Sequence, residues 1–160
     1  MFHRRILIIT ATLAALAGCA TSASGPKSVA DTLAAQPQLS TLNSLVAKAG
    51  LADTLKGTGP FTVFAPSNEA FAKVPAKTMD QLGQDPAKLK ALLTYHVIPG
   101  KVMAAEAKNG NQKTVNGANV ALYKSGDFLT VEEALVQTAD ISATNGVVHI
   151  VDSVLIPPAK

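Results

Sequence analysis

The sequence has few of the residues that build catalytic and nucleic-acid sites. It contains one cysteine, Cys19, so it offers no partner for a disulfide. Its only arginines, Arg4 and Arg5, lie at the amino end, and the rest of the chain lacks the side chain most used for bidentate phosphate and base-edge contacts. Aromatic residues make up 4% of the chain, and lysines form no basic stripe. These absences argue against a nucleic-acid partner.

Sequence motifs for nucleophilic, metal and nucleotide chemistry are also missing. The chain has no G-x-S-x-G, H-E-x-x-H or C-x-x-C motif, no EF-hand loop and no phosphate-binding G-x-x-x-x-G-K-[ST] loop. Two histidines beyond the amino end, His96 and His149, could form a metal or acid–base cluster with Asp152. Because apolar residues flank both, we interpret them instead as hydrogen-bonded core residues. The sequence predicts no enzymatic activity, no cofactor and no metal site.

The amino end has the three parts of a secretory signal. Arg4 and Arg5 precede an apolar run from Ile6 to Ala17, which small residues follow. The run is shorter than the about 20 residues that cross a membrane. We therefore predict a signal peptide over residues 1–18 and exclude it from the fold. Without it, the 14 basic residues become 12 against 11 acidic ones, so the mature protein is close to neutral.

Two processing sites overlap at the end of this signal. Leu16 to Cys19 match the bacterial lipobox, in which the cysteine is lipidated, whereas Ala15 to Ala17 suit an ordinary signal peptidase. We favour the lipoprotein because the only cysteine lies at the lipobox position. Residues 19–27 are then a lipidated Cys19 and a flexible tether, with the protein anchored in the cell envelope, at the outer membrane or in the periplasm. The alternative is a freely secreted form.

One domain is expected over residues 28–158, because 48% of the chain is hydrophobic and the composition does not change along it. The first half predicts short helices: two between Ser28 and Gly50, then turns or helices over 51–56, 68–74, 77–82 and 86–95, with strands at 61–65 and 97–100. The second half predicts a loop over 109–111 and strands over 113–115, 119–124, 128–131, 135–141 and 147–156. The last strand, apolar and β-branched, is expected at the centre of the sheet, covered on both faces.

Three segments resemble the conserved boxes of the fasciclin domain. They are TVFAPSNEAF (62–71), LLTYHVIPGK (92–101) and ADISATNGVVHIVDSVLIP (139–157). Their order and spacing match the family over nearly the whole mature chain. The resemblance implies an α+β fold, a wedge of β-sandwich-like strands with several short helices packed alongside.

The resemblance also implies a function. Fasciclin domains are non-enzymatic modules of adhesion and interaction, so we expect a protein or polysaccharide partner at the cell surface or matrix. The segments through which family members are proposed to contact their partners correspond in this chain to Tyr95, His96, Asp140 and Ile141. The resemblance therefore implies that these four residues form the partner-binding site. The alternative is a periplasmic carrier of a small ligand or carbohydrate. One departure concerns the hairpin before Asp140, where Glu132 and Glu133 replace the Asn-Gly that family members often have. Since glutamate disfavours positive φ, we expect a different or longer turn there, with both side chains solvated.

Overall fold

The computed structural model describes residues 27–157. The predicted signal peptide (1–18) and Cys19 lie outside the described residues, as does almost all of the predicted tether. Within 27–157 no helix is long and apolar enough to cross a membrane.

The amino-terminal half is mainly helical, as predicted. Side-chain caps explain where its helices begin: Ser28 forms a capping box with Asp31, Ser67 accepts from the amide of Ala70, and Asp85 caps a helix that has Pro86 at its first position. The helical elements are α1 (Val29–Ala35), the 3-10 turn η1 (Pro37–Leu39), α2 (Ser40–Lys48), α3 (Ala52–Lys56), α4 (Asn68–Ala72), α5 (Ala76–Gln84) and α6 (Pro86–Tyr95).

Seven strands form one sheet in the order β2-β1-β7-β6-β5-β4-β3. Strand β1 pairs with β7 in parallel, and every other pairing is antiparallel. Strand β7 is therefore interior, and all six of its residues are buried, which confirms its predicted place. The strands are β1 (Phe61–Pro66), β2 (Val97–Pro99), β3 (Gly110–Lys113), β4 (Asn119–Ser125), β5 (Phe128–Val131), β6 (Ala134–Ala143) and β7 (Gly146–Val151).

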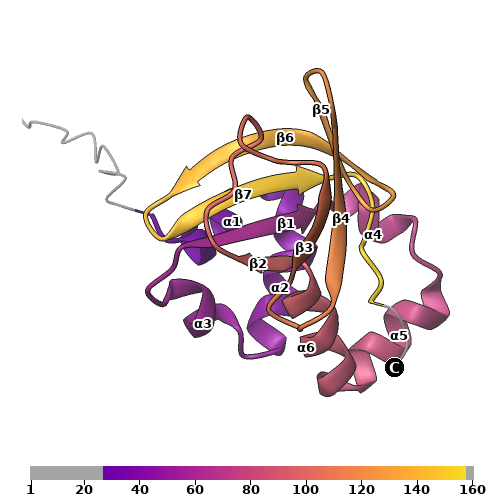
Figure 1. Cartoon of the computed structure of the whole chain (residues 1–160). Coiled ribbons are helices and arrows are strands. Elements are labelled where there is room, and N and C mark those ends of the chain that lie inside the picture. The colour runs from indigo at the N-terminus through magenta and orange to yellow at the C-terminus, as the bar shows by residue number, and fades with distance from the viewer. Residues whose placement is uncertain (1–26, 158–160) are drawn as a thin grey trace, which may run out of the picture.

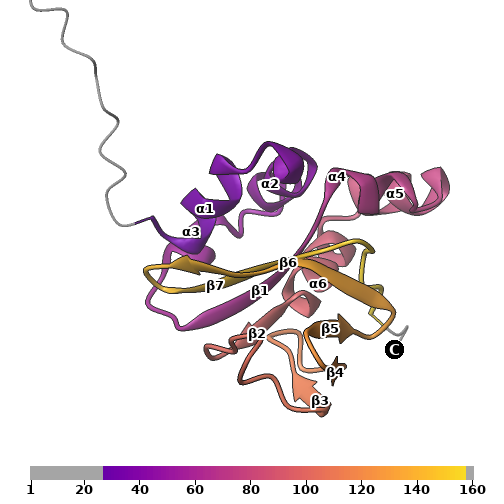
Figure 2. The ribbon, with the colours of Figure 1, turned by 90° about the horizontal axis from the view of Figure 1, so that it is seen from above.

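The central strands β1 and β7 lie between the amino-terminal helices and the strands β3 to β5 (Figures 1 and 2), and they separate two hydrophobic cores. On one face, Val63 of β1 and Ile150 of β7 pack against the amino-terminal helices. On the other face, Phe64 of β1 and Val151 of β7 pack against Leu122 of β4 and other residues of the part of the sheet that curls over them. The predicted α+β class with β-sandwich-like strands is confirmed, because β1 and β7 lie between a helical layer and a strand layer.

Two predicted strand boundaries are wrong. Strand β3 begins at Gly110, inside the segment predicted as a loop, and it ends at Lys113, because its backbone pairs with β4 despite its poor strand propensity. Strand β7 ends at Val151 rather than Ile156, and the side chain of Ile156 is 61% exposed.

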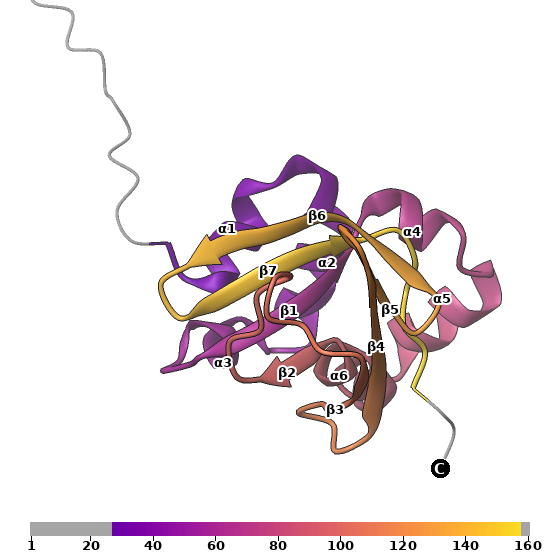
Figure 3. The ribbon, with the colours of Figure 1, turned by 45° about the horizontal axis from the view of Figure 1, so that its top comes forward.

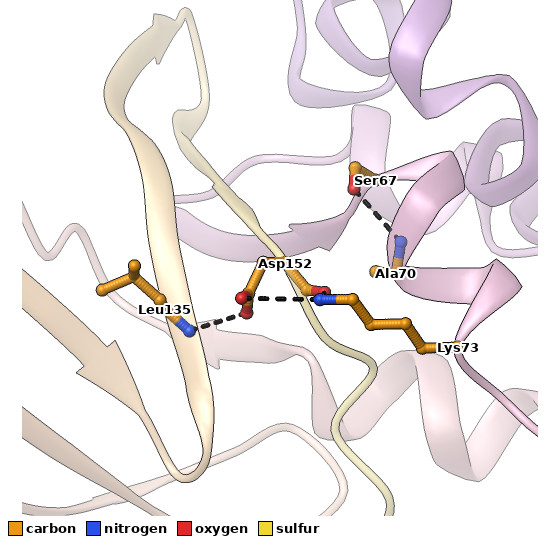
Figure 4. A network of polar contacts seen from close by, with 5 residues as sticks. All are labelled: Ser67, Ala70, Lys73, Leu135 and Asp152. Atoms are coloured by element: carbon orange, nitrogen blue, oxygen red, sulfur yellow. Dashed lines mark hydrogen bonds and ion pairs between the residues drawn. The ribbon is translucent and has the colours of Figure 1, made fainter.

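The end of β7 has a local cause at Asp152 (Figure 4). The Asp152 amide still donates to the Leu135 carbonyl, but the Asp152 carboxylate, rather than a backbone carbonyl, accepts from the Leu135 amide at 2.9 Å. The freed carbonyl of Asp152 accepts from Lys73 Nζ at 2.9 Å, and Lys73 Nζ lies 3.6 Å from the carboxylate. Burial acts to raise the pKa of Asp152, but these hydrogen bonds and Lys73 hold it below its usual value. The Asp152 side chain thus takes the place of a backbone carbonyl in the hydrogen bonding between β6 and β7, and the backbone leaves the sheet.

Candidate interaction surface

His96, a predicted contact residue, is 1% exposed at the end of α6. Its Nδ1 lies 2.8 Å from the carbonyl oxygen of Leu92, and its Nε2 accepts from the amide of Leu155 at 3.0 Å. The imidazole is therefore neutral, with the proton on Nδ1. Burial lowers its pKa from 6.5 to about 4, against the opposing effect of the hydrogen bond to Leu92. This histidine joins α6 to the carboxyl-terminal segment.

Tyr95, the second predicted contact residue, is 3% exposed. Its hydroxyl donates to the carbonyl oxygen of Asn119 at 3.1 Å and lies 3.4 Å from a carboxylate oxygen of Glu132. Burial, followed by the Glu132 charge, raises the pKa of Tyr95. Since Tyr95 and His96 have almost no free surface, any effect on a partner would act through the elements that they fix.

Asp140 and His149 hold the segment after β2 in place. Asp140 lies at a bulge of β6, with φ of 58°, where the pairing with β7 shifts between Thr138 and Ile141. Its carboxylate accepts from the amide of Ala104 at 2.8 Å, and its amide donates to His149 Nδ1 at 3.2 Å. The other nitrogen, His149 Nε2, donates to the Val102 carbonyl at 2.8 Å. These bonds fix residues 102–104 against β6 and β7.

The His149 ring has its own packing partner. It stacks on Phe64 of the adjacent strand, with centroids 5.4 Å apart, and is completely buried. Burial lowers its pKa, while the Val102 hydrogen bond and the Asp140 charge oppose that shift. His149 and His96 are thus both hydrogen-bonded core residues, as we interpreted them.

Asp140 and Ile141 keep part of their surface. Both are intermediate in burial, and Ile141 packs against the helical-side core. The structure therefore brings Asp140 together with His149. Among the described residues, no hydrogen bond links Asp140 or Ile141 to Tyr95 or His96. The four residues do not form one exposed patch.

The turn at Glu132 and Glu133 is of a different type from an Asn-Gly turn, as expected, because only Glu132 and not Glu133 takes up positive φ. It joins β5 to β6 with two residues, since Val131 pairs with Ala134, and Glu132 takes up φ of 56°. The strain is offset because the Glu132 amide donates to the Ala121 carbonyl and the Glu132 carboxylate accepts from the Ala121 amide at 2.9 Å. A glutamate thus tolerates positive φ here, contrary to the expectation. Glu132 and Glu133 are both exposed, as predicted, although the Glu132 carboxylate also forms a hydrogen bond.

Sequence reasoning missed an exposed aromatic surface on the β4–β5 hairpin. The side chains of Tyr123 and Phe128 are 57% and 67% exposed. Leu122 and Val131, their inward-facing neighbours, are completely buried. The sequence held a signal for this surface: inward and outward residues alternate along β4 and β5, and the two aromatic residues occupy outward positions. We call the outward residues of this hairpin from Ala121 to Thr130 the hairpin face: Ala121, Tyr123, Ser125, Phe128 and Thr130.

The hairpin lies away from the place where the described chain begins. The coloured ribbon begins at the left of the domain, before α1, whereas β4 and β5 lie right of its centre in each view (Figures 1 to 3). In Figure 1 the hairpin tip extends above the rest of the sheet.

A second surface feature is an apolar groove of about 560 Å³. It lies between α5, α6 and the carboxyl-terminal segment, and its walls include Leu82, Leu92 and Ile156. Within residues 27–157, no group of three or more His, Cys, Asp or Glu side chains is arranged to hold a metal ion.

The fasciclin domain model matches residues 37–157. The chain is 39% identical to protein sll1483 of Synechocystis over 81% of this chain and 73% of the relative, and 40% identical to immunogenic protein MPB70 of Mycobacterium bovis over 77% and 65%. It is also 39% identical to cell surface glycolipoprotein MPB83 of the same species, over 82% of this chain and 61% of that one. The match thus spans about two thirds of these mycobacterial relatives.

A solved structure has the same fold. It is a FAS1 domain pair from the insect cell adhesion molecule fasciclin I, with a TM-score of 0.65 over 82% of this chain and 51% of that one, at 17% identity. This likeness confirms the predicted wedge, and the relatives include cell-surface and cell-adhesion proteins. The chain belongs to the fasciclin domain family.

Proposed function

We propose that this protein is a lipid-anchored, non-enzymatic interaction module of the cell envelope that binds a protein or polysaccharide partner. The observation that carries the proposal is the hairpin face, where two large aromatic side chains lie in solvent. Exposed aromatic side chains next to polar ones are typical of binding surfaces. Family membership, together with the cell-surface and adhesion relatives, supports the same role.

The buried polar residues support the scaffold rather than a reaction. His96 and His149 each use both ring nitrogens in hydrogen bonds to the backbone. Neither has a free nitrogen to act as a base or a ligand in this conformation. Asp140 and Ile141 remain candidates for direct contact because each keeps part of its surface, whereas we assign Tyr95 and His96 a positioning role.

Crosslinking in living cells tests this function. Cells that produce the full-length protein would be treated with a membrane-permeant crosslinker, and the partners identified by mass spectrometry and by sugar analysis. The proposal expects one partner to be enriched over cells that lack the protein. Replacing Tyr123 and Phe128 with Thr should lower this yield, since it removes both rings but keeps strand propensity. Val115→Thr is the matched control, because Val115 is a 45% exposed apolar residue outside the hairpin face and the groove. Absence of any enriched partner would contradict the proposal.

The anchor has its own test. We propose that Cys19 is lipidated and that residues 20–27 tether the domain. More than one acyl chain would make the attachment stable, at about 0.8 kcal/mol per buried methylene. A palmitate analogue should label the wild type and not Cys19→Ser, and the variant should leave the membrane fraction. An unlabelled wild type would indicate the secreted form.

A second candidate function is a carrier of a small apolar ligand. The groove favours it, since its volume of about 560 Å³ lies in the usual range for small-molecule sites, roughly 300–1,000 Å³. An apolar fluorescent probe should then bind the wild type, and Ile156→Thr should weaken this binding. Equal binding by both proteins would remove the groove from consideration.

A further inference from the structure

We propose that the partner held by the hairpin face is a neutral polysaccharide, whose sugar rings stack on Tyr123 and Phe128. This inference rests on the proposed function and names the chemistry of the partner. It assigns a role to a surface that none of the predicted contact residues covers.

The strand register places the two rings on one face. Tyr123 pairs with Thr130, and Ser125 pairs with Phe128, so Tyr123 and Phe128 are diagonal neighbours on adjacent strands. Diagonal neighbours in an antiparallel sheet are about 7–8 Å apart, within reach of aromatic side chains. One oligosaccharide can therefore contact both rings.

The exposure of these rings is unusual within this protein. The described residues contain six aromatic side chains, and the other four are buried or half-buried: Phe61, Phe64, Phe71 and Tyr95. Leaving a large apolar ring in water forgoes the favourable free energy of burying it. Two such rings on the same face of one hairpin indicate a surface that another molecule covers.

The charge of the face favours a neutral partner. None of the five residues of the hairpin face is charged. Lys124 lies between Tyr123 and Ser125, but it belongs to the other side of the hairpin, where its Nζ donates to the Ala105 carbonyl at 2.9 Å. The charged residues at the two ends of the face are acidic, Asp127 in the turn before Phe128 and Glu132 after the far end of β5. Carboxylates at both ends disfavour anionic polymers and anionic lipid headgroups, and membrane-surface segments are usually basic.

The polar atoms of the face suit sugar hydroxyl groups. The Tyr123 phenol and the Ser125 hydroxyl can donate and accept hydrogen bonds, and Asn111 of β3 stands opposite Ala121 at the edge of the face. Thr130 Oγ1 donates to the Tyr123 carbonyl at 3.2 Å and keeps its acceptor lone pairs. The apolar faces of a sugar ring can pack on the aromatic rings while its hydroxyl groups bind at the rim.

A neutral polysaccharide fits the hairpin face better than a protein does. A stable protein interface covers about 800 Å² on each partner, with roughly 20–30 residues a side. The hairpin face has five outward residues, of which two are large and apolar, and Leu135 of β6, beside Thr130, extends it by one residue that is 37% exposed. Such a small surface suits a linear polymer, whose repeated units multiply a weak contact.

The test is sedimentation of the purified full-length protein, in detergent, with insoluble cellulose and chitin. We expect the wild type to bind one of them at least tenfold better than Tyr123→Thr/Phe128→Thr. The conservative variant Tyr123→Phe/Phe128→Tyr, which keeps two rings, should retain binding within about threefold. Val115→Thr, at a residue that is 45% exposed outside the hairpin face and the groove, serves as the matched control and should bind as the wild type does. Ile156→Thr reports on binding in the groove. Circular dichroism should show that all variants fold.

Two outcomes overturn the inference. One is that wild type and Tyr123→Thr/Phe128→Thr bind cellulose and chitin equally or not at all. The other is that binding persists in that variant but is lost in Ile156→Thr, which assigns it to the groove. If the in-cell experiment recovers a protein while both polysaccharides fail, the interaction function stands and the polysaccharide assignment does not.

Discussion

Acid should begin to destabilise this domain as the pH falls below 6.5. The cause is His96, which is completely buried and neutral, with a pKa of about 4 against the ordinary 6.5. Below pH 6.5 the unfolded chain takes up a proton at His96, whereas the folded domain does not. The unfolded state then binds more protons, so the free energy of unfolding falls as the pH falls.

The size of the effect follows from the two pKa values. The pKa of His96 is 6.5 in the unfolded chain and about 4 in the folded domain. This difference lowers the free energy of unfolding by about 3 kcal/mol at pH 4 and below, and by about 2 kcal/mol already at pH 5. The pKa of His149 is also lowered, so its contribution has the same sign. The pKa values of Asp31, Asp85 and Asp152 are lowered too, and therefore their stabilising contributions are lost only below this window.

Urea unfolding at pH 7.5, 6.5, 5.5 and 5.0 measures this loss. A change of about 2 kcal/mol moves the midpoint by roughly 1 M urea, at a slope of about 2 kcal/mol per M. His96→Gln keeps a donor and an acceptor but does not titrate, so its midpoint should change less with pH. NMR should show no protonation of His96 in the folded wild type above pH 5. A flat wild-type profile, or an equal slope in the variant, would refute the reasoning.

Two further predictions concern stability. Gly146→Ala should lower the free energy of unfolding by about 3 kcal/mol or more, because an added Cβ would overlap the Phe61 carbonyl where β7 pairs with β1. A urea midpoint within about 0.3 M of the wild-type value, which corresponds to roughly 0.6 kcal/mol, would show instead that the strands can separate. Asp140→Ala should cost about 1–3 kcal/mol, because the Ala104 amide loses its acceptor and alanine disfavours φ of 58°; Asp140→Asn should cost much less, and equal losses would contradict this role.

Local signals in the sequence predicted most of the fold. Pro86 after Asp85 marks the start of α6, and the apolar run from Val147 predicts the buried strand β7. The end of β7 could not be predicted, because it depends on the Asp152 carboxylate meeting an amide 17 residues away. The bounds of strand β3 were misplaced for a similar reason, since only the pairing with β4 makes residues 110–113 a strand.

The candidate site was harder to predict than the fold. Tyr95 and His96 lie in a family motif, but motif position does not distinguish a buried residue from an exposed one. Their side chains point inward because α6 ends against β4 and the carboxyl-terminal segment. Tyr123 and Phe128 belong to strands that the alternation predicted. Their exposure depends on which face of the hairpin the second core covers.

Site-specific photo-crosslinking tests the central claim, that this protein binds a partner through its hairpin face. Benzoylphenylalanine, which inserts into C–H bonds of proteins and sugars alike, would replace Phe128 or Ile156 in the full-length protein in living cells. These two positions are similarly exposed, at 67% and 61%. The account predicts a light-dependent adduct at position 128 at least fivefold above that at position 156. Equal adducts at both positions, or none at 128, would contradict it.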